Sequence, residues 1–157
     1  DETGINMAIH PDDPPWDMFG LPRIITGAES YDKMIKSVPN KHNGFTFCTG
    51  SLGAGRGNDL AAMANKYAKR IYFAHIRQLK YNGDKDFTEA GHLTSAGNLD
   101  IYGIVKALVE AGFDGYVRPD HGRNIWGEDG KPGYGLYDRA LGAAYLNGLF
   151  EAVQKNK

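Results

Sequence analysis

The chain has 157 residues, of which 41% are hydrophobic, enough for the core of one domain of ordinary size. Its 18 basic and 19 acidic residues leave a formal net charge of −1, so the basic excess typical of nucleic-acid-binding proteins is absent. No apolar run approaches the ~18 residues of a membrane span, and the single cysteine, Cys48, excludes an internal disulfide and favours a reducing, cytoplasmic setting.

Four short apolar segments predict strands, and each is followed by a segment with helical periodicity. The expected strands are 6–10, 45–48, 71–76 and 116–118. The expected helices are 29–38, one after residue 57 that Asn58 or Asp59 caps, 99–110 and 136–153. Residues 49–57 and 80–98 are expected to be connecting loops.

Four successive β-α units predict a parallel sheet with crossover helices, either a (β/α)8-type barrel or a doubly wound sheet. Four units cannot close a barrel of eight strands, so the barrel interpretation requires partner strands from outside this chain. The chain also opens almost directly on a core strand, from which we expect it to begin partway through a larger protein.

One polar side chain ends each expected strand, namely His10, Cys48, His75 and Asp120. In a parallel α/β fold the carboxyl ends of the strands share one face, where active sites are built. Taken singly, a lone cysteine is more often a small buried hydrophobe, and a strand-end histidine is more often structural. The coincidence of all four favours a site for Mn²⁺, Fe²⁺ or Zn²⁺.

Four further side chains are candidates for chemistry near this site. His121 follows Asp120 and is suited to general acid or base catalysis, although it could instead support a ligand. Tyr134 lies between two glycines and could close over a substrate or pack on the last helix. Arg77 and Arg118 could bind a substrate carboxylate, and an ion pair within the protein is the alternative.

Five long strings of residues resemble the C-terminal half of mannonate dehydratase. They are MAIHPDDPPW, FCTGSLGAG, FAHIRQ, RPDHGRNIWGE and PGYGLYDRALGAAYLNGL, and the resemblance runs from about Ile5 to the end of the last helix. It implies a xylose-isomerase-like (β/α)8 TIM barrel, of which residues 1–157 supply the last four β/α units as a single domain. The implied partner is the N-terminal half of the same barrel. A homodimer is compatible with the family, although no feature of this sequence requires one.

The resemblance also implies a reaction, the dehydration of D-mannonate to 2-keto-3-deoxy-D-gluconate in hexuronate breakdown, assisted by Mn²⁺ or Fe²⁺. The implied metal ligands are His10, Cys48, His75 and Asp120, and the implied catalytic pair is His121 and Tyr134. Loss of water requires removal of the C2 proton and departure of the C3 hydroxyl, with a cation stabilising the enediolate. The sequence does not decide which of the pair is the base.

Two other functions remain open. A metal-dependent sugar isomerase or epimerase on the same barrel would use similar strand-end ligands, but it could not form a 2-keto-3-deoxy acid. A catalytically silent module would bind the sugar acid without turnover.

Overall fold

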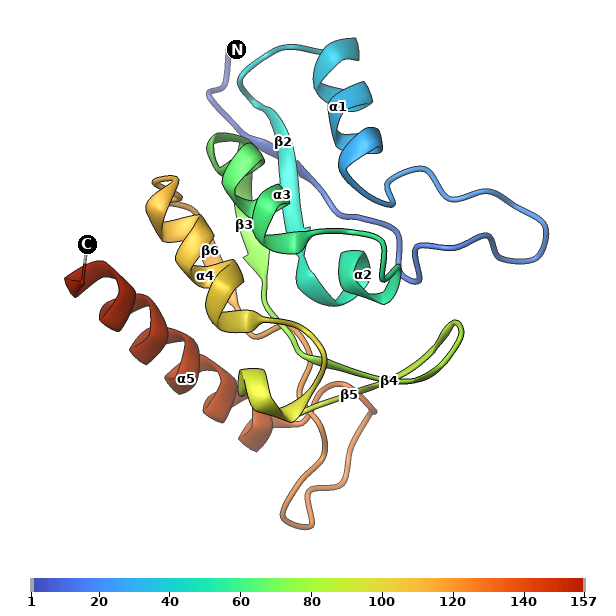
Figure 1. Cartoon of the computed structure of the whole chain (residues 1–157), viewed down its shortest axis with the longest axis vertical. Helices are drawn as coiled ribbons and strands as arrows, with labels where there is room; N and C mark the ends of the chain where they lie inside the picture. Colours follow the sequence, from blue (N-terminus) through green and yellow to red (C-terminus); the bar gives the residue numbers. More distant parts are fainter. Residues whose placement is uncertain (1, 157) are drawn as a thin grey trace.

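The computed structural model describes residues 2–156, in which strands and helices alternate along most of the chain (Figure 1). The strands are β1 (Met7–Ile9), β2 (Asn43–Cys48), β3 (Ile71–His75), β4 (Leu79–Gly83), β5 (Asp86–Glu89) and β6 (Tyr116–Arg118). The helices are α1 (Ala28–Ser37), α2 (Thr49–Ala54), α3 (Leu60–Tyr67), α4 (Ile101–Glu110) and α5 (Leu136–Lys155).

The main sheet has four parallel strands in the order β1-β2-β3-β6, so the predicted parallel sheet is confirmed. β1 and β6 lie at its two edges. Helices connect consecutive strands, and α3 packs on α4, which packs in turn on α5 (Figure 1). Sequential β-α units of this kind place all strand carboxyl ends on one side of the sheet.

The core lies between the sheet and the helices that cover it. β2 is almost wholly buried, as a central strand of a parallel sheet should be. Its Phe45 stacks on Tyr31 of α1 with ring centroids 3.7 Å apart, and Tyr67 of α3 meets both rings edge-on. Burial of one such aromatic side chain contributes about 1.5–3 kcal/mol, which holds α1 and α3 against the sheet.

Aspartate side chains cap the beginnings of two helices, and the first of these caps was predicted from the sequence. Asp59, one of the two expected caps, accepts a hydrogen bond from the backbone N–H of Ala62 and starts α3. Asp100 does the same for α4 through Gly103. α4 ends just before Gly112, whose φ of +74° is a left-handed conformation that glycine adopts without strain.

Two segments that were expected to be loops contain regular structure. Residues 49–54 form the short helix α2, although their glycines lower its helical propensity. Its residues are fully buried, so packing outweighs that local preference. Residues 79–89 form the antiparallel hairpin β4–β5 within the expected polar connection. Both predictions were therefore wrong.

None of the helices formed by residues 2–156 combines the length and the apolar character needed to cross a lipid bilayer.

Candidate metal centre

The four predicted ligands lie together at the end of the sheet that is formed by the carboxyl ends of its parallel strands. Cys48 ends β2 and is paired in register with His75, which ends β3. His10 follows β1 directly, and Asp120 lies two residues beyond β6. The equivalence of these strand-end positions, which was inferred from sequence alone, is therefore present in the fold.

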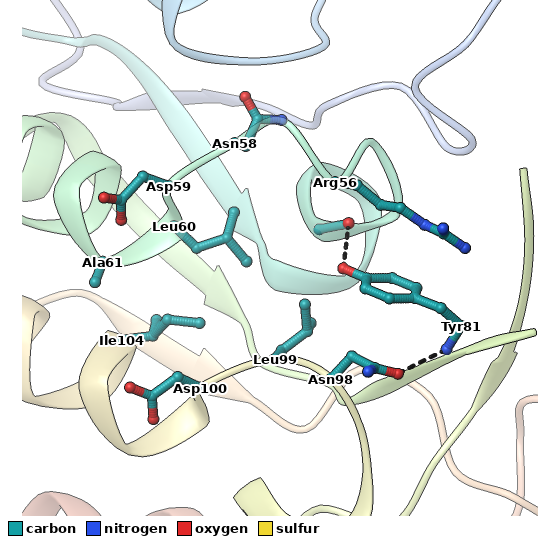
Figure 2. A pocket seen from close by; sticks show the side chains of 11 residues that line it. Arg56, Asn58, Asp59, Leu60, Ala61, Tyr81, Asn98, Leu99, Asp100 and Ile104 are labelled. Carbon is teal, nitrogen blue, oxygen red and sulfur yellow. Dashed lines mark hydrogen bonds between the residues drawn. The ribbon is translucent and has the colours of Figure 1, made fainter. Parts of the chain in front are cut away.

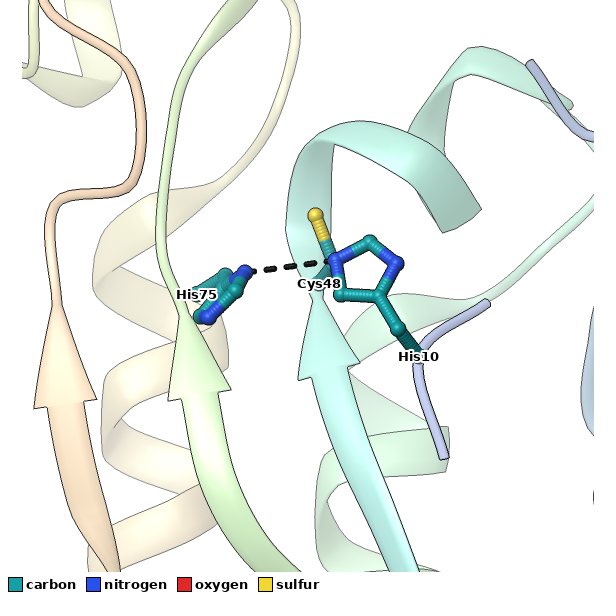
Figure 3. Close-up of side chains that lie close together, drawn as sticks. All are labelled: His10, Cys48 and His75. Carbon is teal, nitrogen blue, oxygen red and sulfur yellow. Dashed lines mark hydrogen bonds between the residues drawn. The ribbon is translucent and has the colours of Figure 1, made fainter. Parts of the chain in front are cut away.

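Three of these side chains form a tight cluster (Figure 3). His10, Cys48 and His75 each offer one ligand atom, and these atoms all lie within 4.8 Å of one another. His10 Nε2 is 3.2 Å from His75 Nδ1. The other nitrogen of His10, Nδ1, lies 2.6 Å from the carbonyl oxygen of Pro11, which can only accept. Nδ1 therefore carries the proton, and Nε2 presents its lone pair to the cluster, the usual arrangement for a metal-binding histidine.

Asp120 adjoins two members of the cluster. Its Oδ1 is 3.3 Å from His75 Nδ1, and its Oδ2 is 3.7 Å from Cys48 Sγ. The residue has a φ of +59°, a conformation that non-glycine residues adopt rarely and that often marks functional positions. The chain thus departs from the extended course of β6 at the point where its carboxylate meets the cluster.

The electrostatics of the cluster suit a divalent cation. Burial lowers the pKa of His75 to about 4, which keeps its imidazole neutral and able to coordinate. Burial raises the pKa of the Cys48 thiol, although Arg77 acts in the opposite direction, and Ser51 donates two hydrogen bonds to Sγ. Burial also opposes ionisation of Asp120, but His75, His121 and two arginines outweigh it and leave the pKa of this carboxyl lowered.

The donor set therefore fits a transition metal. Two imidazoles, a sulfur and a carboxylate provide more lone pairs than there are protons to share among them, and a cation would satisfy all four. The structure brings the predicted ligands together, and their role as ligands stays a prediction.

Arg77 is buried beside this cluster and is surrounded by carboxylates. It pairs with Asp13 through Nη2 and with Glu89 through Nη1, and its Nε lies 3.3 Å from Asp120 Oδ2. Only 3% of its side chain is exposed. Ion pairing within the protein, the alternative foreseen for this residue, therefore describes its contacts, and substrate binding by Arg77 stays a prediction.

The two predicted catalytic side chains lie on the connection between β6 and α5. His121 Nδ1 is 2.8 Å from Glu89 Oε1, and its Nε2 is 3.9 Å from Asp120 Oδ2. Tyr134 is about half exposed, and its ring faces Arg139, whose Cζ lies 4.8 Å from the ring centroid. Backbone hydrogen bonds of Gly122 to Gly133 and Gly135 close this connection at its base and fix where it begins and ends.

An open cavity of about 570 Å³ joins several of these groups. Its lining includes Arg118, Asp120, Tyr134 and Arg139. Arg118 Nη2 is 2.8 Å from Asp120 Oδ1, and 45% of the Arg118 side chain is exposed. Arg118 therefore retains access to solvent, which a carboxylate-binding residue needs.

Comparison with known proteins adds an independent observation. The family model described as D-mannonate dehydratase (UxuA) matches residues 1–157. This chain belongs to the mannonate dehydratase family. It is 53% identical over 159 residues to the mannonate dehydratase of Thermotoga petrophila, covering 100% of this chain and 44% of that protein. The crystal structure of mannonate dehydratase from Streptococcus suis serotype 2 superposes with a TM-score of 0.93 at 50% identity, covering 99% of this chain and 45% of that one.

The comparisons also establish the fold. A xylose isomerase-like TIM barrel protein from Mycobacterium smegmatis matches with a TM-score of 0.66 at 17% identity, covering 98% of this chain and 46% of that one. The parallel sheet described above is thus part of a barrel of the xylose-isomerase-like kind, as predicted. The chain spans less than half the length of the mannonate dehydratases that it matches.

Sequence reasoning missed Glu89 and Arg139, which contact the two predicted catalytic residues. Glu89 lies on the hairpin that was expected to be a loop. A signal for the hairpin was present, because Asn82-Gly83 precedes a short turn between segments containing Tyr81 and Phe87. Arg139 gave no such signal, since it is one of several polar residues on α5.

A second cavity, of about 380 Å³, lies away from the cluster, between the α2–α3 connection, β4 and the start of α4 (Figure 2). Its polar groups are already engaged. Asp59 and Asp100 cap helices, and the Tyr81 hydroxyl donates to the carbonyl of Gly53. The cavity therefore offers no converging set of free catalytic groups.

Proposed function

We propose that the protein containing this chain catalyses the metal-dependent dehydration of D-mannonate to 2-keto-3-deoxy-D-gluconate. The observation that carries the proposal is the clustering of His10, Cys48 and His75 beside Asp120, in a chain that belongs to the mannonate dehydratase family. A thiolate ligand also favours a reducing compartment, so we propose a cytoplasmic location.

The residues that would hold the metal are His10, Cys48, His75 and Asp120. We propose Mn²⁺ or Fe²⁺, both of which accept a mixed shell of nitrogen, sulfur and oxygen donors. When bound, such a cation stabilises the negative charge that develops on the substrate as the C2 proton leaves.

The protein's own side chains move the protons. Dehydration needs one group that removes the C2 proton and another that protonates the departing C3 hydroxyl. We assign these two tasks to His121 and Tyr134. His121 has its Nε2 on the side of Asp120, and Tyr134 lines the cavity that Asp120 also lines. Arg118, which lines the same cavity, would bind the substrate carboxylate. Arg77, whose Nε lies 3.3 Å from Asp120 Oδ2, would add a second positive charge to this carboxylate-binding site.

We further propose that residues 1–157 form one domain whose partner is the N-terminal half of the same barrel. The edge strands support this proposal. Met7 on β1 is 67% exposed and Tyr116 on β6 is 82% exposed, although large apolar side chains on barrel strands are normally covered. Additional strands that pair with β1 and β6 would cover them and remove two open sheet edges.

Replacement of His121 tests the assignment of the catalytic pair. In a version of the chain extended upstream to the length of its relatives, we expect His121→Asn to lower kcat by about 10²–10⁴-fold. Metal content should not change, because Nε2 lies outside the described cluster of ligands. Intact turnover with metal bound would disprove the role of His121. The product is the second readout, because a keto-deoxy acid distinguishes a dehydratase from an isomerase and from a silent binding module.

A further inference from the structure

Glu89 reaches the proposed active site from a different part of the fold than any other residue assigned so far. It ends β5 and pairs with Leu79 of β4, whose side chain is fully buried. Phe87, two residues earlier, packs edge-on against Trp16 with ring centroids 6.0 Å apart. The hairpin is therefore anchored on two sides, and Glu89 is held in a defined place rather than on a free loop.

The Glu89 carboxylate joins His121 to Arg77. Its Oε1 lies 2.8 Å from His121 Nδ1 and also accepts a hydrogen bond from Arg77 Nη1. About a quarter of the Glu89 side chain is exposed, and Arg77 is buried. An ionised carboxylate oxygen can accept two hydrogen bonds at once, so both neighbours can donate to it.

This arrangement selects one tautomer of His121. A carboxylate can only accept, so a nitrogen 2.8 Å from Oε1 must carry a proton, since otherwise two lone pairs would face each other. Arg77 Nη1 also lies 2.9 Å from this nitrogen, but the ionised Glu89 carboxylate is the stronger acceptor and makes the shorter contact, so we assign the Nη1 proton to Oε1 and the Nδ1 proton to His121. The neutral ring of His121 therefore has its proton on Nδ1 and its lone pair on Nε2, which lies 3.9 Å from Asp120 Oδ2.

We propose that Glu89 is a positioning residue that holds His121 in the tautomer and orientation required for proton transfer through Nε2. The inference rests on the proposed function, because it gives Glu89 its role through the catalytic task of His121. A carboxylate hydrogen-bonded to the far nitrogen of an imidazole fixes the ring and stabilises the imidazolium that forms when Nε2 takes a proton. The same hydrogen bond keeps the ring in place when Nε2 gives its proton up again.

The first test compares variants in the upstream-extended protein loaded with Mn²⁺. We expect Glu89→Ala to lower kcat by about 10²–10⁴-fold, as removal of an orienting carboxylate does elsewhere. KM for D-mannonate should change by less than about threefold if Glu89 acts only through His121. The matched control is Asp86→Asn, which neutralises an exposed carboxylate on the same strand and should leave kcat unchanged.

The second test separates positioning from general support of the fold. If Glu89 acts through His121, Glu89→Ala should lower kcat no further when His121→Asn is already present. In the metal-free parent labelled with ¹⁵N-histidine, His121 should show a protonated Nδ1 and an unprotonated Nε2. Glu89→Ala should abolish that preference, and the signal is assigned by its loss in His121→Asn.

The outcomes distinguish the inference from the function beneath it. Full turnover in His121→Asn would overturn the proposed catalytic role itself. Loss of turnover in His121→Asn with normal turnover in Glu89→Ala would overturn the role of Glu89 alone. An equal loss from Glu89→Ala in both backgrounds, or an unchanged tautomer, would also overturn it.

Discussion

Arg77 occupies its buried position because Gly50 leaves room for it. A Cβ built at Gly50 would lie 1.9 Å from Arg77 Nε and 2.5 Å from its Cζ. The guanidinium is the shared partner of Asp13, Glu89 and Asp120. Because these carboxylates surround the proposed site, a displaced Arg77 would leave negative charges close together without compensation.

Gly50→Ala should therefore destabilise the protein although it replaces glycine within a helix. Such a change usually stabilises by about 0.5–1 kcal/mol. At Gly50 we expect the free energy of unfolding to fall by about 1–3 kcal/mol, because the added methyl overpacks the site. The control is Gly148→Ala in α5, where a Cβ would meet nothing within 4 Å and should stabilise. Urea unfolding measures the free energy of unfolding of both variants. An equal gain in stability would contradict the claim that Arg77 needs the space that Gly50 leaves.

At the scale of elements, a buried carboxylate joins α5 to the segment that carries both proposed catalytic residues. Asp138, in the first turn of α5, accepts hydrogen bonds from the backbone N–H, Nε and Nη2 of Arg123 at 2.8–3.0 Å. His92 also contacts Asp138, because its Nε2 lies 2.8 Å from the backbone carbonyl oxygen and 3.5 Å from Oδ1 of that residue. This clamp, formed by Asp138 and Arg123, fixes the segment between His121 and Tyr134 at Arg123.

Asp138→Asn should weaken that clamp in a pH-dependent manner. Burial opposes ionisation of Asp138, but its hydrogen bonds with Arg123 and the charge of His92 outweigh burial and lower its pKa below 3.8. A carboxyl with a lowered pKa contributes stability above its unfolded-state pKa and loses it as the pH falls through the folded-state value. We expect Asp138→Asn to lower the free energy of unfolding by about 1–2 kcal/mol near neutral pH. The effect is no larger because Arg123 is partly exposed and its charge is screened by solvent.

The stability difference between the parent and Asp138→Asn should shrink as the pH falls below 3.8, because the parent then loses the same charge. Urea unfolding across this range measures it. Asp84→Asn, at an exposed position in the turn between β4 and β5, is the control and should be neutral throughout. A difference that is constant with pH would show that shape, rather than charge, carries the effect.

The elements that could be predicted from sequence are those with strong local patterns. The strand 71–76 was predicted from its continuous apolar run, and the start of α3 was predicted from the capping residues Asn58 and Asp59. α2 could not be predicted, because its glycines argue against a helix and only the surrounding core stabilises it. The hairpin was missed because its alternation is short and interrupted by charged residues.

The candidate site divides in the same way. His10, Cys48, His75 and Asp120 could be predicted because the ends of parallel strands converge for topological reasons. Glu89 could not, because its position depends on how a hairpin folds back over the sheet, which no local pattern specifies. The contacts of Arg77 likewise depend on carboxylates from three separate segments.

At the scale of the whole molecule, the four-stranded sheet has one well-packed side and two open edges. The helices cover the core, whereas large apolar side chains on β1 and β6 remain exposed. Since the chain covers 44% of a full-length relative, the remainder of such a protein is long enough to supply the missing barrel strands. The proposed site lies at the carboxyl ends of the strands, where a completed barrel would enclose it.

The most direct test of the central claim is the rate at which D-mannonate is converted to a 2-keto-3-deoxy acid, with and without added Mn²⁺. It is measured on the 157-residue chain and on the upstream-extended protein, each first stripped of metal by chelation. We predict that only the extended protein turns over, and only after metal is restored. Equal turnover without metal, or metal binding by the extended protein with no keto-deoxy acid formed, would contradict the proposed reaction.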